Sequence, residues 1–183
     1  MGNKVKKLFF IIITALSLPI GAMPAKEAVR LAGNVLQVTN PVIAGVVSTQ
    51  EMGALHFGAH YIQALSLSHA LKFTGSWLKP DCARRPNLGN YSGMPSGHTV
   101  SAWSAASYSR LYSKNDNLTY ALYGAALFTG ASRIISKHHT FQQVLVAAMM
   151  SEIVNELNHE SGWLNYYATY DFNVASLGIT IKL

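Results

Sequence analysis

Three short clusters in this 183-residue chain carry side chains that suit phosphate chemistry. They are Arg84-Arg85-Pro86, Pro95-Ser96-Gly97-His98 and Ser132-Arg133, the last followed six residues later by His139. The imidazole of His139 can act as a nucleophile that takes up a phosphoryl group, which water later hydrolyses. The imidazole of His98 titrates near neutral pH and suits a general acid. The pattern therefore predicts a phosphoryl-transfer reaction in which His139 is the nucleophile and His98 is the general acid.

Residues that can hold the phosphoryl oxygens flank both histidines. Ser96 follows a proline and opens an apolar stretch, so we expect it to cap a helix whose free N–H groups attract an anion. Gly97 lets a ligand approach the backbone closely. The guanidinium groups of Arg85 and Arg133 can each bind phosphate oxygens through paired hydrogen bonds.

Each cluster also has a purely structural interpretation. Pro-Ser-Gly is a common helix start, Arg133 would suit the negative end of a helix dipole, and His138 and His139 would suit a loop. The order and spacing of the three clusters favour the chemical interpretation.

The three clusters resemble the motifs of the type 2 phosphatidic acid phosphatase superfamily, which includes bacterial class A acid phosphatases and vanadium haloperoxidases. Its pattern is Lys-x6-Arg-Pro, then Pro-Ser-Gly-His, then Ser-Arg-x5-His-x3-Asp, and the resemblance covers roughly Arg30 to Leu157. It implies a helical bundle that holds the phosphate between the blocks. It also implies the roles given above: His139 as the nucleophile, His98 as the acid on the leaving oxygen, and a phosphate-binding set of Arg85, Ser96, Gly97 and Arg133.

Two lysines compete for the place of the family's lysine. Lys72-x6-Lys79-Pro80 has the spacing of the first block with Lys in place of Arg, whereas Arg85-Pro86 has the right dipeptide and the usual distance to the second block. A six-residue insertion between Lys72 and Arg85 accounts for both observations. Either Lys72 or Lys79 then supplies the additional phosphate-binding cation.

Gln143 stands where the family has an aspartate. A carboxylate would hold the imidazole of His139 in one tautomer and stabilise its positive charge, whereas a glutamine oxygen can only orient it. Some lipid-diphosphate phosphatases of the superfamily look similar at this position. Thr140-Phe141-Gln142-Gln143 also fits a capping box for the helix that follows, and both roles are compatible.

Helices must position these blocks. Apolar periodicity predicts a helix over 25–38, a break at Asn40-Pro41, an apolar run over 42–47, and helices over about 51–73, 95–112, 118–135 and 140–157. We expect an all-α fold, a bundle of about five to six helices, with Trp103 and Tyr108 on a core face. His56 and His60 have a spacing that metal ligands use, but only Glu51 is a nearby acid, so we expect structural histidines and no metal site.

The two ends of the chain differ from the middle. Lys4, Lys6 and Lys7 precede a 13-residue apolar run that is too short to cross a bilayer about 30 Å thick comfortably, which predicts a signal peptide over 1–22. An uncleaved anchor is the alternative. The helical phosphatase domain would then span 23–160, and the period-two alternation in 161–183 predicts a small β-hairpin or strand.

Composition excludes several other classes of protein. Half of the residues are apolar and 12% are charged, which excludes a disordered chain. The single Cys82 excludes an intramolecular disulfide framework and a cysteine-based zinc finger. The net charge of +6 includes the three N-terminal lysines, and no basic stripe with interleaved aromatic residues remains without them, so nucleic acid is excluded as a partner.

We therefore expect an exported phosphatase, located in the periplasm or at the periplasmic face of a bacterial membrane, that needs no metal or cofactor. Its substrate would be a phosphomonoester or a diphosphate. Apolar helices and an export signal favour a lipid phosphate and association with a membrane. A soluble phosphomonoester, a phosphotransferase using the same site, and a catalytically impaired envelope binding protein stay open as alternatives.

Overall fold

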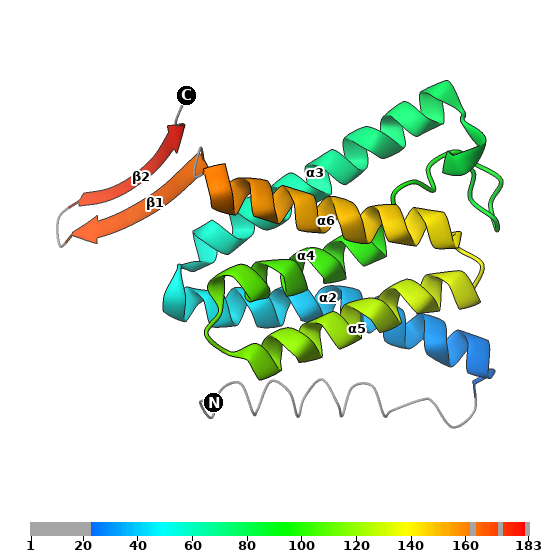
Figure 1. The fold of residues 1–183 in the computed structure, drawn as a ribbon, viewed down its shortest axis with the longest axis horizontal. Helices are drawn as coiled ribbons and strands as arrows, with labels where there is room; N and C mark the ends of the chain where they lie inside the picture. Colours follow the sequence, from blue (N-terminus) through cyan, green and yellow to red (C-terminus); the bar gives the residue numbers. More distant parts are fainter. Residues whose placement is uncertain (1–22, 162–163, 172–173, 182–183) are drawn as a thin grey trace.

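The computed structural model describes residues 23–161, 164–171 and 174–181. In this part of the chain, five α-helices form one bundle (Figure 1). They are α2 (Ala25–Glu51), α3 (Ala54–Leu78), α4 (Gly97–Tyr112), α5 (Asp116–Ile135) and α6 (Phe141–Ser161), with a short 3-10 helix, η2 (Asp81–Ala83), between α3 and α4. The predicted helical bundle is thus confirmed for the described residues.

Small side chains place α4 at the centre of the bundle. This helix packs against each of the other four helices, because alanines and serines on its faces let neighbouring backbones come close. Ala102, Ala105 and Ala106 are fully buried in the core, where Tyr108 is also buried and Trp103 packs against them. The expected core face of this helix is confirmed.

The predicted break at Asn40-Pro41 is wrong, because α2 continues through Pro41. A proline inside a helix has no N–H for the carbonyl four residues earlier. That carbonyl belongs to Gln37, and it accepts a hydrogen bond of 2.6 Å from the hydroxyl of Ser101 on α4 instead. The buried amide of Asn40 donates to the carbonyls of Ala102 and Leu122, which ties α2 to two other helices at the same level.

Other boundaries differ from the prediction by a few residues. The largest difference is at the end of α3, which continues past Phe73 to Leu78. Lys79 then adopts a left-handed conformation, with φ of 52°, and its N–H bonds the carbonyl of Gly75. The helix therefore ends at Leu78, with Lys79 as its C-cap, and not at Phe73.

After α6 the chain continues in two strands, β1 (Leu164–Asp171) and β2 (Val174–Ile181), which pair antiparallel from Leu164 with Ile181 to Asp171 with Val174. An isolated two-stranded hairpin is marginally stable in water, so a stable C-terminal hairpin stays a prediction. The predicted signal peptide, 1–22, lies outside the described residues. Among those that are described, no helix combines the length and the apolar character needed to cross a membrane.

His56 and His60 pack in an aromatic cluster at the far end of α3 from the predicted site. The Nδ1 atom of His56 lies 2.8 Å from the hydroxyl of Tyr108, and that of His60 lies 3.2 Å from Oδ1 of Asn155. Within the described ranges, no three His, Cys, Asp or Glu side chains are grouped as a metal site would require.

Candidate active site

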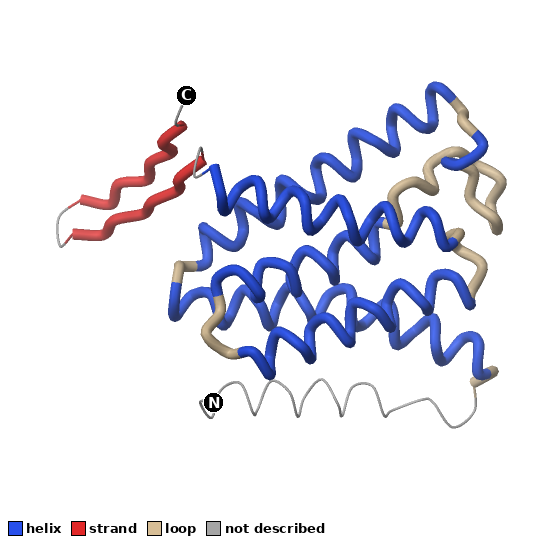
Figure 2. Tube along the Cα trace, viewed as in Figure 1, coloured by secondary structure: helices blue, strands red, loops and turns tan. Residues whose placement is uncertain are grey.

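The predicted site residues come from six different parts of the bundle. Lys72 lies near the end of α3, Arg85 in the loop that follows, His98 in the first turn of α4 and Arg133 in the last turn of α5. His139 lies in the turn between α5 and α6, and Gln143 follows in the first turn of α6. Figure 2 shows that the loop between α3 and α4 and the turn between α5 and α6 lie at the same end of the bundle.

His139 is buried and its ring is oriented by Gln143. Its Nδ1 atom lies 3.0 Å from Oε1 of Gln143. The side-chain amide nitrogen of Gln143 donates to the carbonyls of Cys82 and Arg84, each at 2.9 Å, which fixes the direction of the amide. Because Oε1 can only accept, Nδ1 of His139 carries the proton and Nε2 carries the lone pair. This is the tautomer that a nucleophilic Nε2 requires.

Gln143 also holds the surrounding backbone together. It forms a capping box with Thr140: the Thr140 N–H donates to Oε1 of Gln143, and the Gln143 N–H donates to the Thr140 hydroxyl, both at 3.3 Å. A Cβ atom at Gly93 would lie within 2.8 Å of both side-chain amide atoms of Gln143, so only glycine fits there. The expected capping box is confirmed, and the same side chain joins α6 to the loop that carries Arg85.

This arrangement makes a prediction about Gln143→Glu, which has the same shape but replaces the amide by a carboxylate. The carbonyls of Cys82 and Arg84 would lose their donor and face a negative charge. We expect the free energy of unfolding to fall by about 1–3 kcal/mol, measured by urea denaturation, and the phosphatase activity not to rise. Gln142→Glu, at an exposed neighbouring position, is the control. A more active and equally stable Gln143→Glu variant would contradict this description of the site.

His98 and Arg133 share one acceptor, Asn34 on α2. Oδ1 of Asn34 lies 3.1 Å from Nε2 of His98 and accepts a hydrogen bond of 2.9 Å from Nη1 of Arg133. Because the guanidinium of Arg133 can only donate, the atom of Asn34 that it contacts must be the acceptor oxygen, Oδ1. The same oxygen faces Nε2 of His98, so Nε2 carries a proton and donates it. A Cβ atom at Gly33 would lie 1.9 Å from Oγ of Ser132, so glycine is needed for α2 to approach α5 here.

Arg133 is 2% exposed and makes two further hydrogen bonds, from Nη2 to the carbonyl of Arg30 and from Nε to Oγ of Ser132. Its own carbonyl accepts the N–H groups of His138 and His139. The turn that carries His139 therefore folds back onto the arginine that precedes it by six residues.

The structure places Lys72, and not Lys79, beside the first turn of α4. A Cβ atom at Gly97 would lie 3.9 Å from Nζ of Lys72, which donates to the carbonyl of Ser92 at 3.2 Å. Lys79 is exposed at the end of α3. Nε of Arg85 makes a long contact of 3.5 Å with the carbonyl of His138, which brings Arg85 to the turn that carries the histidines.

Ser96 occupies the N-cap position of α4, as predicted, but its side chain makes no capping bond. It is fully buried, its hydroxyl oxygen accepts from the hydroxyl of Thr99, and its N–H donates to the carbonyl of Gln143. Ser96 therefore has the predicted N-cap position, but its side chain does not form the predicted capping hydrogen bond.

The charged groups that lower the pKa values of His98 and His139 are all basic side chains. Burial, together with the charge of Arg85, lowers the pKa of Lys72 to about 8, and burial lowers the pKa of His139 to about 4. Burial also lowers the pKa of His98 to about 4, and nearby Arg133 adds to the effect. In the described part of the chain, ion pairs join only Arg110 to Glu152 and Glu156, so no carboxylate compensates these cations.

Asn34 and Gly33 are the site residues that the sequence analysis missed. Asn34 is a polar side chain within the apolar stripe of the first helix, and it follows a glycine. A glycine inside a helix is a signal of close backbone approach. The pair could have been recognised as a contact point on that signal, but its partners lie about 60 and 100 residues further along the chain.

Comparison with known proteins identifies a relative and a family. A curated relative named lipid A 4'-phosphatase, from Helicobacter pylori (strain J99), is 28% identical over 162 residues, which cover 81% of this chain and 79% of that protein. No solved structure matches the chain significantly. A family model described as the PAP2 superfamily matches residues 53–155, more than half of the chain, and this segment contains all three blocks of the site. The chain therefore belongs to the PAP2 superfamily.

Proposed function

We propose that this protein is a phosphatase that hydrolyses lipid phosphates through a phosphohistidine formed on His139. One observation carries the proposal: Lys72, Arg85 and Arg133 lie around His98 and His139, and none of these three cations forms an ion pair with a carboxylate among the described residues. Cations that are partly removed from water and unpaired are costly. A phosphate group would compensate them, and the N–H groups at the start of α4 would add to its binding.

The tautomers of His139 and His98 determine which ring nitrogen acts in each step of the proposed reaction. The Nε2 lone pair of His139 attacks phosphorus, the bond from phosphorus to the leaving oxygen breaks, and His98 gives that oxygen a proton. Water then attacks the phosphoryl group, His98 takes one of its protons, and the bond from phosphorus to Nε2 breaks. Phosphate leaves, and both histidines return to their starting forms.

Substrate binding would prepare His98 for its role. In the unliganded site, burial and the nearby cations keep its pKa near 4, so the ring is neutral at pH 7. A bound phosphate dianion adds negative charge beside the ring and raises this pKa. Because Nε2 already holds a proton toward Asn34, the additional proton resides on Nδ1, and this is the proton that the leaving oxygen would receive.

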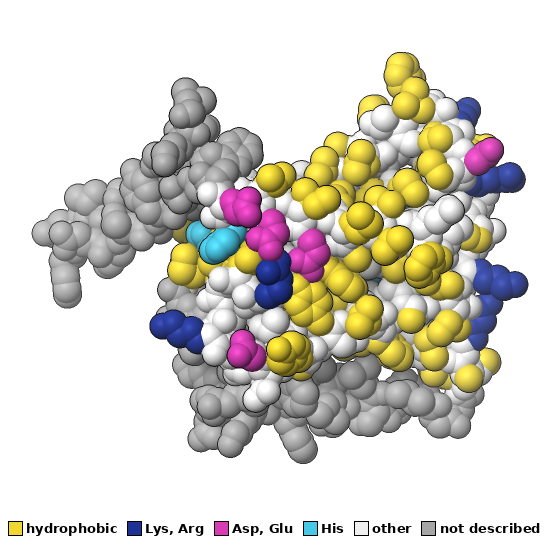
Figure 3. Space-filling model, viewed as in Figure 1, with side chains coloured by type: hydrophobic (Ala, Val, Ile, Leu, Met, Phe, Trp, Pro, Cys, Tyr) yellow, Lys and Arg dark blue, Asp and Glu magenta, His cyan; other side chains and the backbone are white. Residues whose placement is uncertain are grey.

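A lipid substrate is supported by the relative and by the surface. The relative's name specifies a lipid phosphate as its substrate. Exposed apolar side chains recur at every fourth residue along α6, and Figure 3 shows the hydrophobic face that they form with α3. The row on α6 consists of Phe141, Leu145, Met149, Ile153 and Leu157. Apolar faces of this extent suit contact with a lipid surface.

Export is part of the same proposal. The three lysines and the apolar run in residues 1–22 support a signal peptide, and we propose that the protein acts at the periplasmic face of a bacterial membrane. Fractionation of cells expressing the full chain tests this location. Recovery in the cytoplasmic fraction would contradict it.

Metal independence is proposed because three protein cations and a helix N-terminus can stabilise the charge of the transferring group without a metal ion. We expect purified protein to release phosphate from a lipid phosphate, and treatment with EDTA to change the rate less than about twofold. The assay is phosphate release before and after EDTA, with magnesium added back as a control. If EDTA abolishes the activity and a divalent cation restores it, metal independence is wrong. If no phosphate is released under any condition, the proposed phosphatase function is wrong.

Asn34 is proposed to position both His98 and Arg133. Asn34→Leu has a similar volume but no acceptor, so we expect kcat to fall by about 10- to 100-fold. Asn34→Asp keeps an acceptor oxygen and adds a negative charge, so it should raise the pKa of His98, measured by NMR titration. Asn117→Leu, an exposed position on α5, is the control. An Asn34→Leu variant with wild-type kcat would show that Asn34 has no such role.

A further inference from the structure

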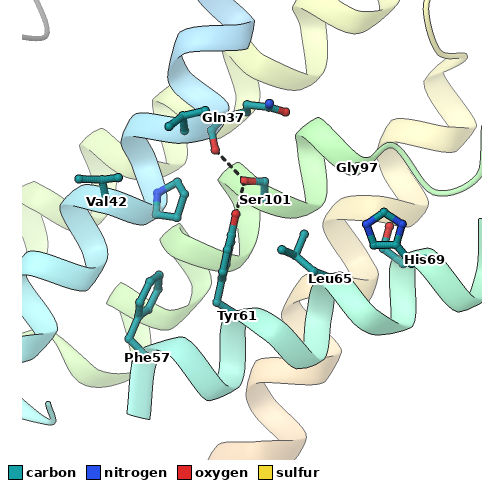
Figure 4. Close-up of a pocket in the computed structure, with 11 residues that line it drawn as sticks. Gln37, Val42, Phe57, Tyr61, Leu65, His69, Gly97 and Ser101 are labelled. Atoms are coloured by element: carbon teal, nitrogen blue, oxygen red, sulfur yellow. Dashed lines mark hydrogen bonds between the residues drawn. The ribbon is translucent and has the colours of Figure 1, made fainter. Parts of the chain in front are cut away.

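A pocket of about 540 Å³ lies between α2, α3 and α4, directly beside the candidate active site. Figure 4 shows Gly97 and His69 at one end of it and Phe57 and Val42 at the other. The Nζ atom of Lys72 also lies beside Gly97. The pocket and the phosphate-binding end of α4 are therefore continuous.

The chemical character of the pocket changes along its length. At the end beside the site, the pocket is bordered by Gly97, and Lys72 supplies a cation there. In the middle, Tyr61, Ser101 and the carbonyl of Gln37 form a chain of hydrogen bonds of 2.6 Å each, so their polar groups are already paired with one another. Beyond them the walls are apolar, and they are made by Val38, Pro41, Val42 and Phe57, whereas Leu65 lies between Tyr61 and His69.

Ser68 adds a second, independent observation. It lines the pocket and is 1% exposed, yet its hydroxyl has no hydrogen-bond partner among the described residues. A buried hydroxyl without a partner costs free energy, and a ligand with a polar group at this level would satisfy it. Ser68 lies one helical turn before Lys72, so both residues lie on the same face of α3.

We propose that this pocket binds the acyl chain of the lipid phosphate, with Ser68 contacting the ester, amide or hydroxyl group that links the chain to the phosphate-bearing end. This inference rests on the proposed function, because it assigns a place to the remainder of the same substrate. The sequence of cation, unpaired hydroxyl and apolar wall matches the order of phosphate, polar linker and hydrocarbon in such a molecule. The volume lies within the range of pockets that bind small apolar ligands.

Two water-soluble probes test the pocket: butyl phosphate and decyl phosphate, each used below its aggregation concentration. We expect kcat/KM of the wild-type protein to be at least about tenfold higher for decyl phosphate, because the longer chain buries more apolar surface. Val42→Trp should reduce this ratio to about one, while kcat/KM for butyl phosphate changes less than about twofold. Val46→Trp, on the same helix but outside the pocket lining, is the matched control and should keep the wild-type ratio.

The outcomes separate this inference from the proposed function. Suppose that both probes are hydrolysed, but the ratio of kcat/KM for decyl phosphate to that for butyl phosphate is near one in the wild type or is unchanged in Val42→Trp. The acyl-chain pocket is then wrong, whereas the proposed phosphatase function is not contradicted. If neither probe is hydrolysed, the proposed function is wrong. The dissociation constants of the two probes, measured by calorimetry, then test the pocket. Tighter binding of decyl phosphate than of butyl phosphate in the wild type, lost in Val42→Trp, supports it, and any other result contradicts it.

Ser68→Ala tests the contact with the linking group. Because the hydroxyl has no partner among the described residues, we expect no loss of thermal stability. The value of kcat/KM should fall about fivefold or more for dioctanoyl phosphatidic acid, which carries ester groups, and stay unchanged for octyl phosphate, which has none. An equal effect on both substrates, or no effect on either, would overturn the role assigned to Ser68.

Discussion

Replacing His139 by alanine is expected to lower phosphatase turnover by about 10⁴-fold or more, because the substitution removes the proposed nucleophile. The structure gives the physical reason. His139 is buried, its ring is oriented through Nδ1 by Gln143, and its lowered pKa keeps Nε2 unprotonated at neutral pH. The measurement is phosphate release by the purified variant from a lipid phosphate and from para-nitrophenyl phosphate.

His138→Ala is the matched control for this experiment. His138 is the neighbouring residue, but among the described residues its ring forms hydrogen bonds only with Ser136 of its own turn, and it contacts Arg85 through its backbone carbonyl. We therefore expect its variant to keep most of the activity. Equal losses in the two variants would show that the turn as a whole is damaged and would remove the case for a nucleophilic His139.

Replacing His98 by alanine is expected to lower turnover by about 10²- to 10⁴-fold for an alkyl phosphate, whose leaving oxygen needs a proton. The loss should be much smaller for para-nitrophenyl phosphate, because its stable phenolate leaves without one. In the wild type, saturation with orthovanadate should raise the pKa of His98 from its value of about 4, as followed by NMR. A loss that is the same for both leaving groups would contradict the role of a general acid.

The helical fold could be predicted from the sequence because apolar periodicity is a local property. The prediction failed at Pro41, where the carbonyl of Gln37 lacks its usual helical donor. The hydroxyl of Ser101 donates to this carbonyl instead, and Ser101 lies 64 residues after Gln37 in the sequence. No local pattern contains that information. The end of α3 was predicted at Phe73 and lies at Leu78, because Gly75 lies inside the helix although glycine often marks the end of one.

The site was predictable where its residues form contiguous motifs. His98, Arg133 and His139 lie in such motifs, and the structure places them at one end of the bundle. The choice between Lys72 and Lys79 was not predictable, because it depends on how the loop between α3 and α4 folds back onto α4. Asn34 was missed because it lies outside all three blocks, and also outside the segment that the family model matches.

Gln143 shows how a departure from a family pattern can have a structural reason. Seen in sequence, glutamine is a weaker substitute for aspartate beside the proposed nucleophile, His139. In the structure, its longer side chain orients His139 and also donates to the two carbonyls of the loop that carries Arg85. An aspartate has no N–H groups with which to make the second set of bonds.

The central claim is that a phosphoryl group is transferred to Nε2 of His139 during turnover. It is tested most directly by mixing the wild-type protein with a lipid phosphate, quenching the reaction within the first turnover under alkaline conditions, and locating the phosphoryl group by mass spectrometry. We predict that the phosphoryl group is found on His139 and is absent when the reaction is repeated with His139→Ala. A phosphoryl group on any other side chain, or undiminished turnover by His139→Ala, would contradict the mechanism.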